Sequence, residues 1–200
     1  LVYAIPKDRV FRQDWSDAVG DAMLNIQLWT LLQMNGKTFA LYSRVPEVCH
    51  LQSNSANYLS NTWNKVAAEL QICFSDFDSN PSTNWVVYAD VLHDVNAAGR
   101  LGAGRLGLTM MPRQDLEGLG GQKCVVTDEG SNYCATQLRW VGGLGHELGH
   151  SFGLPHPPGC DLGLASCDSN ALMWAGYADY PNTYWREDDK ASLLMSKFFR

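Results

Sequence analysis

The sequence lacks the features that mark nucleic-acid-binding and membrane-spanning proteins. Its 200 residues carry a formal net charge of −6, and no run of Lys or Arg is longer than two. No basic surface for a nucleic acid or an anionic bilayer is therefore expected. No stretch reaches the roughly eighteen uninterrupted apolar residues that a spanning helix needs. Neither a nucleic acid nor a membrane is predicted as a partner.

Internal repeats, low-complexity tracts and linkers are also missing. With 46% hydrophobic residues, the chain can form a substantial core, so a single domain covering residues 1–200 and a monomeric state are expected. The sequence begins at Leu1, directly in a strand-like segment. We therefore expect either a processed mature form or a trimmed chain, whose leader or pro-segment is not included.

The six cysteines form no C-x-x-C pair, which argues against a thiolate zinc knuckle and a thioredoxin-like redox motif. An even number fits three disulfides in an oxidising compartment, and the protein is predicted to be secreted. Buried free thiols are the alternative. Pairing of neighbours along the chain predicts the bridges Cys49–Cys73, Cys124–Cys134 and Cys160–Cys167.

Hydrophobic periodicity predicts an α+β fold with a largely irregular C-terminal lobe. Asp14 is the expected N-cap of a long amphipathic helix that Asn35-Gly36 ends. The predicted strands are VYAI, 38–43, 85–92 and 105–111, and Pro112 makes the last one a candidate edge strand. The other predicted helices carry Trp63, Val66, Ala67 and Leu70, then residues 136–151, then a short stretch from Glu187.

The stretch HELGHSFGLPH has the spacing of a metal site. His146 and His150 stand one helical turn apart on one face, where two imidazoles can reach the same ion. His156 lies too far along to share that helix, and Gly153 allows the chain to turn back towards the metal. Three neutral nitrogen ligands that leave a fourth position for water are typical of catalytic zinc.

Glu147 is not needed to bind the metal. Next to the first ligand, it is placed to take a proton from the activated water and pass it to a leaving amine. Leu144 and Leu148 are expected to anchor the helix in the core. The pattern therefore favours a hydrolase with one zinc ion.

The motif H-E-x-x-H-x-x-G-x-x-H is matched at all five fixed positions, and the chain resembles the metzincin metallopeptidases. The resemblance implies a two-lobed catalytic domain with a twisted, mostly parallel sheet and an antiparallel edge strand. It also implies a backing helix, the active-site helix and a smaller irregular C-terminal lobe with a closing helix. The lobes would be residues 1–153 and 154–200. Met173, in SNALMW, is similar to the clan's turn methionine beneath the metal.

The family within the clan stays open. Pro157 is similar to serralysins and the cysteine content to astacins. In both families a tyrosine two residues after the turn methionine can approach the zinc; that position is Ala175 here, so Tyr177 is a weaker candidate. The resemblance also implies that the edge strand, expected at Leu106–Met111, pairs with an extended substrate, and that a pocket beside His146 sets specificity.

The sequence thus predicts a secreted zinc endopeptidase that cleaves protein or peptide substrates. Two alternatives are a catalytically silent zinc-containing binding module, for example one that recognises glycans, and a zinc amidase acting on a non-peptide bond. The sequence GAGRLG is interpreted as a turn rather than a dinucleotide site because no helix follows it. A structural calcium ion stays open, and His50 and His93 are expected at the surface or as caps.

Overall fold

The computed structural model describes residues 1–92, 102–121 and 137–199. The predicted bridge Cys124–Cys134 and His93 lie outside these described residues. Within them, the predicted bridges Cys49–Cys73 and Cys160–Cys167 are confirmed.

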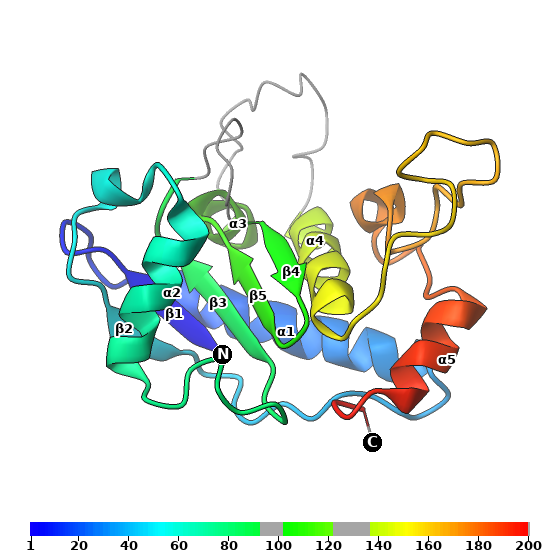
Figure 1. The fold of residues 1–200 in the computed structure, drawn as a ribbon, viewed down its shortest axis with the longest axis horizontal. Helices are drawn as coiled ribbons and strands as arrows, with labels where there is room; N and C mark the ends of the chain where they lie inside the picture. The colour runs from blue at the N-terminus through cyan, green and yellow to red at the C-terminus, as the bar shows by residue number, and fades with distance from the viewer. Residues whose placement is uncertain (93–101, 122–136, 200) are drawn as a thin grey trace.

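A five-stranded sheet forms the centre of the fold (Figure 1), in the order β2-β1-β3-β5-β4. Four neighbouring strands run parallel: β2, β1, β3 and β5. Strand β4 pairs antiparallel with β5. The fold is therefore a mixed α/β arrangement whose mostly parallel sheet carries an antiparallel edge strand, as predicted. The strands are β1 Val2–Ile5, β2 Glu47–His50, β3 Trp85–Ala89, β4 Ala103–Arg105 and β5 Leu108–Met111.

Helices cover both faces of the sheet. The described helices are α1 Gln13–Gln33, α2 Thr62–Cys73, α3 Arg113–Leu119, α4 Gln137–Ser151 and α5 Glu187–Met195, with 3-10 turns η1 Ser55–Tyr58 and η3 Ala175–Asp179. In Figure 1, α2 lies in front of the sheet, α1 passes behind it, and α4 runs beside β4. In the parts of the chain that the structure describes, no helix is both long and apolar enough to span a bilayer.

Alternation along the strands builds two separate cores, because successive side chains of a strand point to opposite faces. On one face, Tyr3, Val86 and Met111 pack with buried residues of α1 and α4. On the other, Val87 and Met110 pack with buried residues of α2. The first core holds the zinc-motif helix, so the geometry of that helix depends on the packing of α1.

Residues 38–43 do not form the predicted strand. Phe39 makes only one isolated bridge, to Phe199. The segment is bonded to α1 instead of the sheet: Thr38 Oγ1 donates to the Gln27 carbonyl, and Gln27 Nε2 donates to the Phe39 carbonyl. The aromatic ring of Phe39 packs in the core that also contains buried residues of α4. The outer parallel strand of the sheet is formed later in the chain, by β2.

The edge strand was predicted at the wrong residues. Gly107 takes φ +84°, and the chain reverses there between β4 and β5. Leu108–Met111 therefore lies inside the sheet, between β3 and β4, and the edge is Ala103–Arg105. The sequence GAGRLG, interpreted as a turn, contains this edge strand as well as the turn.

Two further details differ from the prediction. The N-cap of α1 is Arg12, which makes no side-chain cap. The predicted cap, Asp14, lies in the first turn of the helix, where its carboxylate accepts a hydrogen bond from the Arg12 guanidinium at 3.1 Å. Helix α3, which begins directly after Pro112, was not predicted; its seven residues are too few to show a clear helical period. The long helix, the helix around Val66, the motif helix and the closing helix are confirmed.

Candidate active site

Helix α4 is held rigidly against the rest of the fold. Leu144 and Leu148, the predicted anchors, are both buried in the core shared with α1. Gly149 lets a neighbouring turn approach the helix closely, because a Cβ there would overlap the sulfur of Met173. The helix therefore carries the histidine motif on a fixed support, which is what ligand geometry requires.

The chain reverses after α4 through a glycine in the left-handed region. Gly153 has φ +99°. Its N–H donates to the His150 carbonyl at 3.0 Å, and the Leu154 N–H donates to the Gly149 carbonyl at 2.9 Å. This pair of bonds is the Schellman arrangement, which favours glycine at this position. The reversal brings His156 back beside the helix, as the motif predicts.

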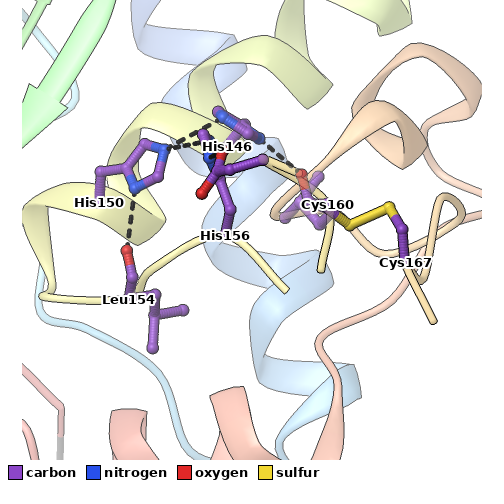
Figure 2. A network of polar contacts seen from close by, with 8 residues as sticks. His146, His150, Leu154, His156, Cys160 and Cys167 are labelled. Atoms are coloured by element: carbon purple, nitrogen blue, oxygen red, sulfur yellow. Dashed lines mark hydrogen bonds and ion pairs between the residues drawn. A yellow bond between two sulfur atoms is a disulfide. The ribbon is translucent and has the colours of Figure 1, made fainter. Parts of the chain in front are cut away.

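The three motif histidines converge (Figure 2). Nε2 of His150 lies 3.2 Å from Nε2 of His146 and 3.1 Å from Nε2 of His156. Among the described residues, these three histidines form a group that could hold a metal ion, because one nitrogen of each lies within 4.8 Å of the others. His146 is buried and the other two are half-buried.

The opposite ring nitrogens of these histidines are all occupied. Nδ1 of His146 lies 2.8 Å from the Leu172 carbonyl, and Nδ1 of His150 lies 2.9 Å from the Leu154 carbonyl. A carbonyl oxygen can only accept, so each Nδ1 carries the proton and each Nε2 keeps its lone pair. Nδ1 of His156 lies 2.7 Å from Oδ1 of the Asp161 carboxylate. It therefore also carries the proton, and Nε2 of His156 keeps its lone pair.

Burial favours the neutral form of His146 and His150. Desolvation is the largest cause that lowers the pKa of His146, to about 4, and it also lowers the pKa of His150. Both imidazoles are therefore uncharged at neutral pH. Metal ligation requires this neutral form.

The donor set fits zinc. Three bare Nε2 atoms that face one another without a hydrogen between them repel unless a cation lies among them. A tetrahedral zinc with bonds of about 2.0–2.1 Å separates its nitrogen ligands by roughly 3.4 Å, close to the two separations found here. Orientation of each ring through its Nδ1–H is also the usual arrangement around zinc.

Glu147 lies at the junction of α4 with the edge of the sheet. Its side chain is half-buried, and its backbone carbonyl accepts a hydrogen bond from Thr109 Oγ1 of β5 at 3.2 Å. Gly104 of β4 packs against the same carbonyl so closely that a Cβ would overlap it. The edge strand therefore passes directly beside the residue that follows the first histidine.

A turn at Leu172 and Met173, in the C-terminal segment, packs against the helix that carries the histidine cluster. Met173 is fully buried against α4, and the preceding residue supplies the carbonyl that orients His146. The ring of Tyr177 lies 5.4 Å from that of His146, centroid to centroid. Tyr177 is thus in ring contact with the predicted ligand set.

Sequence reasoning missed two residues at the site. Asp161 orients His156, and the ring of Trp174 stands 4.9 Å from that of His156 in an edge-to-face contact. Asp161 follows Cys160 directly, in the loop that the Cys160–Cys167 disulfide closes beside the histidines (Figure 2). The pairing of these two cysteines was the available signal, because it folds the loop back onto the motif.

Comparisons with known proteins give likenesses of fold only. No family model matches the chain, and no curated protein matches it. The structure of catalytically inactive OgpA from Akkermansia muciniphila, in complex with the O-glycopeptide substrate glycodrosocin, aligns with a TM-score of 0.65 at 21% identity. That alignment covers 98% of this chain and 59% of OgpA, so the chain spans about three-fifths of its neighbour.

Two other solved structures share the fold. Wild-type OgpA gives a TM-score of 0.64 at 22% identity, covering 99% of this chain and 60% of that one. Archaemetzincin (amzA) from Methanopyrus kandleri gives 0.51 at 12% identity, covering 97% and 93%. The fold that carries the three-histidine cluster is therefore also that of OgpA and of archaemetzincin.

Proposed function

We propose that the chain is a zinc-dependent endopeptidase of the metzincin clan. The observation that carries the proposal is the convergence of three Nε2 atoms, each left bare by a partner on Nδ1. The fold shared with OgpA, whose structure holds an O-glycopeptide substrate, and with archaemetzincin supports the same conclusion. His146, His150 and His156 are assigned as the zinc ligands.

Zinc bound there would act as a Lewis acid, making water nucleophilic near neutral pH and polarising the scissile carbonyl. Glu147 is assigned the proton transfers: it removes the proton of the attacking water and later delivers it to the leaving amine. Strand β4, which passes beside Glu147, is the edge of the sheet in the described part of the chain, and such an edge can align an extended peptide. Met173 is assigned as the clan's turn methionine and Gly153 as the turn that positions His156.

The organisation of the whole chain follows from these assignments. Residues 1–200 would be one catalytic domain with an N-terminal lobe, 1–153, and a C-terminal lobe, 154–200, on either side of the substrate. The two disulfides support an oxidising, extracellular location.

The test is mass-spectrometric cleavage profiling of a complex peptide mixture by the wild type and by Glu147→Ala. Zinc content is measured for both proteins. Cleavage by the wild type alone, with both proteins zinc-loaded, is expected. Equal cleavage by both would remove Glu147 from the mechanism. Absence of cleavage by a zinc-loaded wild type would contradict the peptidase proposal.

A further inference from the structure

Arg139 lies on the same helix as the motif, two turns before His146. Its guanidinium carbon is 4.3 Å from the ring centroid of Trp140 and 5.1 Å from that of Tyr177. The side chain is half-buried. Stacking on two rings restricts the guanidinium, so its position is set before any ligand arrives.

The guanidinium is directed along the helix towards the metal ligands. A Cβ built on Gly143 would stand 3.4 Å from Arg139 Nη1, so the side chain passes over the bare backbone at the glycine between Arg139 and His146. Tyr177 joins the two residues, because the ring that contacts the guanidinium also contacts the His146 ring. The positive charge therefore sits about one helical turn from the first ligand.

Among the described residues, Arg139 forms no ion pair with a carboxylate. Arg12, Arg105, Arg113 and Arg186 each form an ion pair with at least one acidic side chain, whereas none of the described ion pairs involves Arg139. Within the described parts of the chain, the buried acid Asp115 interacts with Arg139 electrostatically. Burial raises the pKa of Asp115 to about 7, so it is partly protonated at neutral pH.

We propose that Arg139 binds a carboxylate carried by the substrate, which makes the site selective for peptides with an acidic group close to the cleaved bond. The inference rests on the proposed peptidase function. A guanidinium stacked on its face keeps its N–H edge available, and that edge matches a carboxylate in a two-bond arrangement. The carboxylate can belong to an Asp or Glu side chain or to the C-terminus of the peptide.

The experiment uses matched peptides that differ by one oxygen-for-nitrogen exchange. Asp is compared with Asn and Glu with Gln at each position around the cleaved bond, and a free C-terminus is compared with a C-terminal amide. The zinc-loaded wild type, Arg139→Gln and Arg139→Lys are assayed with each pair. Arg12→Gln is the control, because Arg12 also stacks on a tryptophan, at 4.2 Å, and its loss changes the net charge equally.

At one position, the wild type is expected to favour the acidic peptide by about 10- to 100-fold in kcat/KM, mainly through KM. Arg139→Gln should abolish this preference, Arg139→Lys should keep part of it, and Arg12→Gln should leave it intact. The responding position identifies the source of the carboxylate. A preference that is absent from the wild type, or unchanged in Arg139→Gln, would overturn the inference.

Equilibrium binding separates this inference from the function on which it rests. Labelled members of each peptide pair are titrated with zinc-loaded Glu147→Gln protein, with and without the Arg139→Gln change. The ratio of the two Kd values should fall towards one when Arg139 is removed. If no peptide is cleaved by the wild type, the peptidase proposal fails, and the binding ratios still decide whether Arg139 recognises a carboxylate.

Discussion

Loss of the Asp161 carboxylate should weaken zinc binding without unfolding the protein. Asp161 orients His156 through a 2.7 Å contact with Nδ1, and it is the one carboxylate among the three Nδ1 partners; the other two are backbone carbonyls. A carboxylate partner raises the basicity of the ligating imidazole as well as fixing its tautomer, and removal of such partners typically costs 10- to 100-fold in metal affinity.

The magnitude for Asp161→Ala should lie at the lower end of this range. The Asp161 side chain is 69% exposed, so water competes for the bond and screens the charge. We expect zinc affinity to fall by about tenfold, or about 1.4 kcal/mol. The assay is competition for zinc against a chromogenic chelator, with the free energy of unfolding measured in parallel.

Two variants serve as controls for this prediction. Asp161→Asn keeps an acceptor oxygen and should recover most of the affinity, whereas Asp179→Ala removes an exposed charge from the neighbouring 3-10 turn and should have no effect. Zinc affinity of Asp161→Ala within about twofold of the wild type would refute the reasoning.

The Cys160–Cys167 disulfide should strengthen zinc binding by positioning the Asp161 carboxylate. Replacing both cysteines by serine frees the loop and should weaken zinc binding when Asp161 is present. In the Asp161→Ala background, the same replacement should have little further effect, because the contact it positions is already missing. Additive losses in this double-mutant cycle would show that the loop does not work through Asp161.

Three other predictions concern stability. Replacing both Cys49 and Cys73 by alanine opens a loop with a sequence separation of 24 and should lower the free energy of unfolding by about 3.5 kcal/mol in denaturant titration; an unchanged midpoint would contradict this. Burial raises the folded-state pKa of Asp115 to about 7, so its contribution to stability is complete below about pH 4 and is lost as pH rises to 7. Asp115→Asn should therefore be more stable than the wild type by on the order of 3 kcal/mol at pH 8, with the difference vanishing at pH 4, in thermal melts across that range. Gly153→Ala should cost roughly 1–2 kcal/mol in unfolding free energy because φ is +99°, and a neutral effect would mean that the turn relaxes.

The local parts of the site could be predicted from the sequence because they depend on spacing alone. Four residues along a helix place His146 and His150 together, and a glycine in the left-handed region returns His156 to them. The carbonyl of Leu172 and the carboxylate of Asp161 come from segments that fold back onto the motif. Apart from the pairing of Cys160 with Cys167 beside Asp161, no period or spacing in the sequence reveals such contacts.

The errors in the fold have the same origin. Residues 38–43 have a strand-like pattern, yet their hydrogen bonds go to α1 and Phe39 is used as core packing. The alternation over residues 105–111 was read as one strand, whereas Gly107 divides it into the end of the edge strand and an interior strand. Local pattern predicts that a segment is extended, but the partner it pairs with depends on the whole sheet.

X-ray absorption spectroscopy at the zinc edge tests the central claim most directly. The wild type, loaded with one equivalent of zinc, should show three imidazole nitrogens at about 2.0–2.1 Å, with the remaining ligand a light atom. His156→Ala should lose one of the three. Sulfur in the first coordination shell, or an unchanged spectrum in His156→Ala, would contradict the assignment of His146, His150 and His156 as the metal centre.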